Sequence, residues 1–224
     1  MIYRKEIDGL RALAVIPVVF YHAGIGFFSG GYVGVDVFFV ISGFLITSLI
    51  LKETSDENFS LLSFYERRAR RLLPALFFMM IICIPFAWIL LIPSELESFG
   101  KSLISTSFFF SNILFWQESG YFSSPSDLKP LIHTWSLSVE EQYYLLFPFL
   151  FSLFNKNIRH YLIIFLIIIF FISLLSSNWA AYNKPSANFY LLPTRVWEIL
   201  SGAMLAFYVT RNFILIKRKL IRNL

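Results

Sequence analysis

Seven ionisable side chains lie inside long apolar stretches of this sequence, where each of them needs a compensating role. A charge at the centre of a membrane-spanning helix costs at least about 2.5–3.5 kcal/mol. Histidine can transfer protons near neutral pH, carboxylates can stabilise a charged histidine, and arginine can bind phosphate oxygens. The seven residues are Arg11, His22, Asp36, Glu140, Glu141, Arg195 and Glu198.

Arg11 and His22 share the first apolar stretch and are eleven residues apart. At 100° per residue, this spacing brings the two side chains to within about 20° of each other around a helix and about 16 Å apart along it. A helix over this stretch therefore carries an arginine and a histidine on one face, with the arginine nearer its beginning.

The histidine suggests acid–base chemistry on a hydroxyl group. A neutral His22 can take the proton of a hydroxyl nucleophile, and a carboxylate can fix its tautomer and stabilise the imidazolium. Glu140 or Glu141 could supply that carboxylate, and the sequence leaves the choice between them open. The alternative is that His22 is a buried residue hydrogen-bonded to a neighbouring helix.

The composition indicates that these residues belong to membrane-spanning helices. The 224 residues are 57% hydrophobic and only 15% charged, whereas soluble domains are rarely more than about half apolar. Several runs approach the ~20 residues that cross a bilayer. We expect an all-α, multi-pass transmembrane bundle with about six spans, at residues 9–28, 33–51, 72–92, 135–154, 161–177 and 195–210.

A seventh apolar stretch, residues 102–116, is too short for a full crossing at 1.5 Å per residue. The distribution of positive charge decides between the two ways of placing it. With six spans and a cytoplasmic N-terminus, fourteen lysines and arginines lie inside and three outside, whereas seven spans give nine and eight. We therefore expect residues 102–116 to form a short re-entrant or interfacial helix, with a seventh span as the alternative.

This arrangement predicts a polar layer near the outer surface. His22, Asp36 and the two glutamates all fall within about 9 Å of that surface when the helical rise is applied. Arg195 and Glu198 stand at the outer end of the last span. We expect some of these side chains to converge on a polar cavity.

Other site classes have no support in the sequence. It contains no zinc-ligand spacing, P-loop or dinucleotide fingerprint, so no metal site is expected. The net charge of +5 lies in loops beside apolar runs, which favours membrane orientation over nucleic-acid binding.

Five ordered segments resemble the acyltransferase 3 family, whose members move acyl groups onto extracytoplasmic carbohydrates. Together they extend over most of the length of the chain, from residue 3 to residue 202. They are residues 3–14 (YRKEIDGLRALA) with His22, residues 30–47 (GGYVGVDVFFVISGFLIT), residues 64–74 (FYERRARRLLP), residues 133–144 (HTWSLSVEEQYY) and residues 195–202 (RVWEILSG).

The resemblance implies a role for each of the matching residues. His22 would be catalytic, with Glu140 and Glu141, and Arg11 would help to hold an acyl-CoA donor, most simply acetyl-CoA. The cavity would include Asp36, Trp135, Tyr143, Arg195 and Glu198. The basic cluster would dock the CoA phosphates, because the guanidinium fork matches phosphate oxygens; its residues are Arg67, Arg68, Arg70 and Arg71. The alternative for this cluster is a positive-inside anchor, and for the aromatic residues an interfacial one.

The expected protein is thus a multi-pass acyltransferase of the bacterial inner membrane. It would transfer an acyl group to a hydroxyl of a surface polysaccharide such as O-antigen. We expect residues 1–210 to form a partial acyltransferase domain and residues 211–224 a basic cytoplasmic tail. The family usually has about ten spans, so a second chain could supply the missing ones. The alternatives are a transporter, since buried ionisable residues also mark transport pathways, and an inactive membrane fragment. The expected partners are membrane lipid, acyl-CoA and a carbohydrate, with no permanently bound cofactor.

Overall fold

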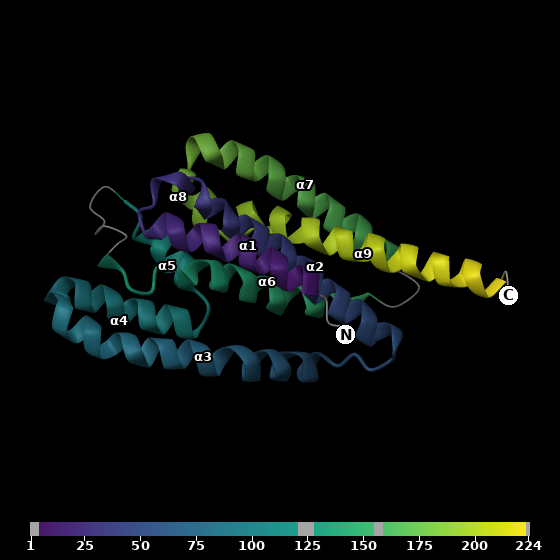
Figure 1. Cartoon of the computed structure of the whole chain (residues 1–224), viewed down its shortest axis with the longest axis horizontal. Coiled ribbons are helices and arrows are strands. Elements are labelled where there is room, and N and C mark those ends of the chain that lie inside the picture. The colour runs from purple at the N-terminus through teal and green to yellow at the C-terminus, as the bar shows by residue number, and fades with distance from the viewer. Residues whose placement is uncertain (1–4, 121–127, 155–158, 223–224) are drawn as a thin grey trace. The chain divides into compact units, whose positions relative to one another are not determined.

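The computed structural model describes residues 5–120, 128–154 and 159–222, and its regular structure within them is helical throughout (Figure 1). The expected all-α fold is confirmed. The elements are α1 (Lys5–His22), η1 (Gly26–Phe28), η2 (Gly31–Val33), α2 (Gly34–Ser55), α3 (Leu61–Leu90), α4 (Pro93–Ser107), α5 (Ser111–Gln117), α6 (Thr134–Leu153), α7 (Arg159–Asn183), α8 (Pro185–Tyr190) and α9 (Leu192–Arg222).

Three described segments are long and apolar enough to cross a membrane: Gly31–Ser55, Leu61–Leu90 and His160–Asn183. The protein is therefore a membrane protein, as its composition indicates. The count of six spans and the cytoplasmic N-terminus stay predictions. Arg4 and Lys156, which entered the charge count, lie outside the described residues, as do the last two residues of the expected tail.

The chain divides into two compact units. Unit 1 comprises residues 1–59, 163–171 and 196–224, and unit 2 comprises residues 60–162 and 172–195. Unit 1 thus holds α1, α2, the middle of α7 and most of α9. Unit 2 holds α3 to α6, α8 and the ends of α7.

Glycine lets the helices of unit 1 approach closely. A Cβ at Gly34 would meet the backbone carbonyl of Ala14, so the start of α2 lies directly against α1. A Cβ at Gly43 would meet the carbonyl of Ile199, which places α2 against α9. Small residues promote this contact in membranes because association there depends on van der Waals packing.

The first helix is shorter than the expected span of residues 9–28. Gly24 adopts a positive φ of 74°, and the N–H of Ile25 donates to the carbonyl of Phe20. This is a Schellman ending, for which glycine is favoured because it lacks a Cβ. The ending makes His22 the last residue of α1, whereas the expected span placed it six residues from its end.

The third helix begins earlier than expected. Ser60 caps it, accepting a hydrogen bond from the N–H of Ser63 at 3.5 Å. The arginine cluster at residues 67–71 is consequently part of the same helix as the apolar run, and not part of a connecting loop. The last helix likewise continues to Arg222, without a break at residue 210. The boundary of the expected tail stays a prediction.

The expected single short helix over residues 102–116 is wrong, because two helices with a sharp turn between them occupy that stretch. Phe109 has a φ of 58°, which is unfavourable for a residue with a Cβ. The Gln142 amide donates to the Phe109 carbonyl at 2.9 Å and so holds the turn from α6. The turn separates α4 from α5.

Hydroxyl groups connect α4, α5 and α6 in the interior of unit 2. The Thr134 hydroxyl donates to Ser111 Oγ at 2.9 Å and lies 3.0 Å from Thr106 Oγ1. Ser111 Oγ in turn lies 2.7 Å from Ser138 Oγ. All four side chains are buried. Hydrogen bonds of this kind join helices in an environment where water cannot satisfy the polar groups.

Candidate functional site

His22 ends α1 in a defined tautomer. Its Nδ1 lies 2.9 Å from the Val18 carbonyl oxygen one turn earlier. Because a carbonyl oxygen only accepts, Nδ1 must carry the proton, and in the neutral ring Nε2 then holds the basic lone pair. The backbone thus fixes the tautomer, a task that we expected a glutamate to perform. Stabilisation of the imidazolium by Glu140 or Glu141 stays a prediction.

Arg11 lies on the same helix as His22 and close to Asp8. Its Nη1 is 3.8 Å from the Asp8 Oδ1, with both side chains partly exposed. An exposed pair of this kind contributes little stability, on the order of 0.5 kcal/mol. The arginine is therefore available for another partner, and its expected role in donor binding stays a prediction.

Two further expected cavity residues belong to unit 1 with the histidine. Asp36 lies in the first turn of α2, two residues after the contact of Gly34 with α1, and is half-buried. Glu198 is buried on α9, next to the contact of Ile199 with Gly43. Unit 1 thus contains Arg11, His22, Asp36 and Glu198.

The two glutamates of α6 have different surroundings in unit 2. Glu141 forms an ion pair with Arg68, its Oε1 lying 2.9 Å from the Arg68 Nη2. Glu140 accepts a hydrogen bond from the Tyr144 hydroxyl at 3.2 Å. The Arg68 guanidinium also lies 4.1 Å above the centre of the Tyr144 ring, a cation–π distance. Arg68 therefore contacts Glu141 directly. It also contacts the ring of Tyr144, whose hydroxyl donates to Glu140.

This ion pair contradicts one part of the expected polar layer. The expected spans placed Glu141 near the outer surface and Arg68 in the cytoplasm, but two residues in direct contact share one depth. Counted along the helices, Arg68 is about 33 Å from the end of α3 and Glu141 about 10 Å from the start of α6. The two helices are therefore staggered, and α4 returns alongside the projecting part of α3 (Figure 1).

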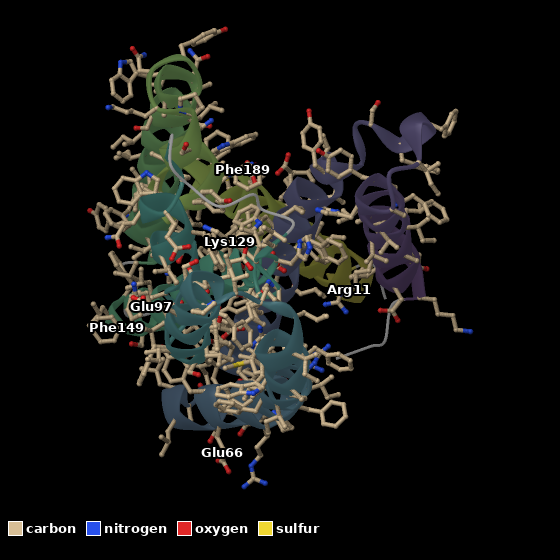
Figure 2. All side chains as sticks on the ribbon, turned by 90° about the vertical axis from the view of Figure 1, so that its left-hand side faces the viewer. Arg11, Glu66, Glu97, Lys129, Phe149 and Phe189 are labelled. Atoms are coloured by element: carbon tan, nitrogen blue, oxygen red, sulfur yellow. The ribbon has the colours of Figure 1, made fainter. Side chains whose placement is uncertain are left out.

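The other three arginines of the cluster are exposed. Arg70 forms an ion pair with Glu66 on its own helix, at 2.7 Å. Glu66 projects outward from α3 (Figure 2). Arg67 and Arg71 are one turn apart along α3. Arg68 is the only half-buried arginine of the four, so the cluster contains two kinds of residue.

A cavity of about 260 Å³ lies beside the ion pair in unit 2. Its walls are mostly aromatic and aliphatic, with Arg68 and Glu141 as the charged groups. Three elements form it: one face of α3, the turn at Phe109, and α6. The lining residues are Phe64, Tyr65, Arg68, Ala69, Leu72, Leu73, Phe108, Phe109, Phe110, Glu141, Gln142, Tyr144 and Leu145.

The expected aromatic residues of the cavity lie in packed clusters. Trp135 is buried against Phe189, with ring centres 4.5 Å apart, and the Arg195 guanidinium lies 5.8 Å from its ring. Tyr143 is buried and stacks on Phe147 at 5.1 Å. These contacts account for the burial of both aromatic side chains, and their expected contact with substrate stays a prediction.

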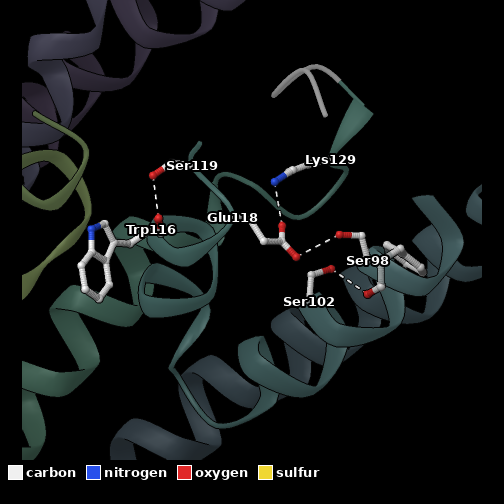
Figure 3. A network of polar contacts seen from close by, with 7 residues as sticks. Ser98, Ser102, Trp116, Glu118, Ser119 and Lys129 are labelled. Carbon is white, nitrogen blue, oxygen red and sulfur yellow. Dashed lines mark hydrogen bonds and ion pairs between the residues drawn. The ribbon is translucent and has the colours of Figure 1, made fainter. Parts of the chain in front are cut away.

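Two polar clusters of unit 2 were not predicted from the sequence. Gln142 donates to Asn112 Oδ1 at 2.8 Å, and Asn112 donates to the Tyr190 carbonyl at 3.1 Å. The amides of Asn112 and Gln142, which stand inside apolar stretches, were the available signal. The second cluster joins Lys129 to Glu118 at 2.6 Å, with Ser98 donating to the same carboxylate (Figure 3).

Glu97, Lys101 and Tyr190, which lie outside the expected spans, have shifted pKa values. The Lys101 ammonium, by hydrogen bond and charge, lowers the pKa of Glu97, and Glu97 in turn raises the pKa of Lys101. Burial raises the pKa of the Tyr190 phenol. These shifts follow from pairing and desolvation within unit 2 and do not require a ligand.

Residues 4–222 match a family described as an acyltransferase domain. The chain is 37% identical to the peptidoglycan O-acetyltransferase OatA of Listeria monocytogenes, over 92% of this chain and 34% of that protein. It is 35% identical to the O-acetyltransferase OatA of Staphylococcus aureus, with the same two coverages. It is 36% identical to the putative peptidoglycan O-acetyltransferase YrhL of Bacillus subtilis, over 91% of this chain and 33% of that protein.

The chain therefore spans about a third of the length of the curated relatives it matches. No solved structure matches it.

Proposed function

Because the chain belongs to the acyltransferase 3 family, we propose that it is a membrane O-acetyltransferase that modifies peptidoglycan. The observation that carries the proposal is the similarity, over 92% of the chain, to a peptidoglycan O-acetyltransferase. This acceptor is narrower than the surface polysaccharides expected from the sequence, and O-antigen has no support among these relatives. The proposed donor is cytoplasmic acetyl-CoA, and the proposed location is the bacterial cytoplasmic membrane with the N-terminus inside.

His22 would act as the general base. Its Nε2 would take the proton of the acceptor hydroxyl while the hydroxyl oxygen forms a bond to the acetyl carbonyl carbon. The carbon–sulfur bond of the thioester then breaks, and the thiolate takes up the proton from the imidazolium. The hydrogen bond from Nδ1 to the Val18 carbonyl supports this assignment, since it leaves Nε2 as the basic nitrogen.

The remaining predicted residues would bind substrates or stabilise charge. A carboxylate of α6 would stabilise the imidazolium, and Arg11 would hold part of the donor. The exposed arginines of α3 would bind the phosphates of CoA, for which their planar forks are suited. Asp36 and Glu198, which belong to the same unit as the histidine, would line the acceptor side of the polar cavity expected from the sequence.

The test measures transfer of labelled acetyl groups from acetyl-CoA to peptidoglycan fragments by the protein in proteoliposomes. We expect His22→Ala to lower the rate by about 10²–10⁴-fold, the usual contribution of a general base. His160→Ala is the matched control, because His160 is an exposed histidine at the start of α7. Equal rates for His22→Ala and the wild type, at equal amounts in the membrane, would reject the role of His22. Movement of substrate across the vesicle without any acetylated product would favour a transporter.

A further inference from the structure

The arginine cluster of α3 contains one residue whose surroundings differ from those of the other three. Arg68 is 24% exposed in its side chain, whereas Arg70 is 79% exposed. The Nε of Arg68 is fully covered and has no hydrogen-bond partner among the described residues. A covered nitrogen cannot reach a phosphate in solution. The guanidinium group of Arg68 is therefore less accessible to a phosphate than those of the exposed arginines.

The partner of Arg68 is on a different helix and is also largely buried. Glu141 is 12% exposed in its side chain, and the pair closes across α3 and α6 at 2.9 Å. The Tyr144 ring covers one face of the guanidinium. The Tyr65 hydroxyl donates to the Leu145 carbonyl at 2.7 Å and joins the same two helices. The ion pair is thus part of the contact that fixes α3 against α6.

Charge and solvation explain why this pair is not readily exchanged for a ligand. Removing one partner would leave the other as an uncompensated charge beside a mostly apolar cavity, which is strongly unfavourable. A phosphate that bound Arg68 would leave the Glu141 carboxylate without its counter-ion beside this mostly apolar cavity. Arg70 carries no such penalty, because it pairs with Glu66 on its own helix in contact with solvent.

We propose that Arg68 and Glu141 form a positioning pair that locks α3 to α6, and that Arg68 does not bind the acyl donor. The statement about the donor rests on the proposed function. Donor binding is then left to the exposed arginines of the cluster. Glu141, with its charge matched by Arg68, acts on the site by holding α6 in place and with it the neighbouring Glu140.

The experiment compares Arg68→Gln, Glu141→Gln and the double variant in detergent and in proteoliposomes. We expect each single variant to lower the apparent Tm and the yield of membrane-inserted protein, and the double variant to recover most of both. A lone charge remains in each single variant but not in the double one, so the two substitutions should not add. Lys101→Gln is the control for loss of an ion pair, because Lys101 pairs with Glu97 on an exposed helix surface.

Kinetics separate positioning from donor binding. We expect the double variant to keep the wild-type KM for acetyl-CoA within about twofold, whereas Arg71→Gln raises this KM severalfold. A double variant no more stable than the worse single variant would overturn the pairing. A raised KM that persists in the double variant would overturn the exclusion of Arg68 from donor binding. Absence of acetyl transfer by the wild type would instead overturn the proposed function, while the stability comparison still tests the pairing.

Discussion

Unit 1 and unit 2 achieve close helix contact by different means. In unit 1, four glycines bring helices within reach of each other's backbone: Gly31 and Gly34 against α1, Gly43 against α9, and Gly202 against α2. In unit 2, hydroxyls, amides and ion pairs between helices perform that task. The difference indicates that helix packing in unit 1 requires residues without a side chain at the contact points. Helix packing in unit 2 requires particular polar atoms.

The variant that we expect to reduce stability most is a test of the glycine contacts of unit 1. Gly43→Ala would place a Cβ against the Ile199 carbonyl, and backbone cannot move aside as a side chain can. We expect α2 and α9 to separate, with a loss of about 3 kcal/mol or more in the free energy of unfolding. The measurement is the apparent Tm in detergent.

The control for this prediction is Gly100→Ala. Gly100 lies inside α4, and a Cβ added there would meet no atom within 4 Å. Alanine favours a helix over glycine, so this variant should gain roughly 0.5–1 kcal/mol. Equal stability of Gly43→Ala and Gly100→Ala would contradict the requirement for glycine at the helix contacts of unit 1.

The next largest effect concerns an ion pair of unit 2. Lys129→Met should destabilise the protein by about 2 kcal/mol, because it leaves the partly buried Glu118 without its counter-ion. Thermal unfolding of Lys129→Met and of the double variant Lys129→Met/Glu118→Gln checks the cause. The double variant should recover stability, and if it is worse than the single one, the ion pair is not the reason.

A smaller effect is expected for the buried hydroxyl chain. Thr134→Val keeps the shape of the side chain but removes the hydroxyl that contacts Ser111, Thr106 and the Leu131 carbonyl. The loss should be about 1 kcal/mol, since a buried hydrogen bond contributes about that much. Ser152→Ala on the exposed part of α6 should stay within roughly 0.5 kcal/mol, the range of surface substitutions. Unfolding midpoints of the two variants measured together would show whether burial decides the size of the effect.

The smallest effect is a pH dependence at the surface of unit 2. Lys101 lowers the pKa of Glu97, so this pair adds stability above the unfolded pKa of the carboxyl and loses it as the pH falls through the folded pKa. The raised pKa of Lys101 means that stability is lost again as the pH rises through that value. Lys101→Ala should return the pKa of Glu97 towards its ordinary value, as measured by NMR titration. The shift should shrink in high salt, and an unchanged shift would argue against an exposed pair.

Much of the fold followed from composition and spacing. Most apolar stretches form helices, and Asp36, Glu140 and Glu141 lie near the beginnings of α2 and α6. The relation of Arg68 to Glu141 did not follow, because 73 residues separate them and their contact depends on the stagger of α3 against α6. Apolar periodicity fixes which segments are helical but carries no information on how far one helix slides along another.

Two helix endings differ in whether local residues or distant contacts explain them. The end of α1 follows from local residues, because Gly24 adopts a positive φ without steric penalty and hydrogen bonds within residues 20–25 close the helix end. The break between α4 and α5 falls on Phe109, where a positive φ is unfavourable for a side chain with a Cβ. That break depends on a hydrogen bond from Gln142, 33 residues later in the chain, which exists only once α6 has packed beside it.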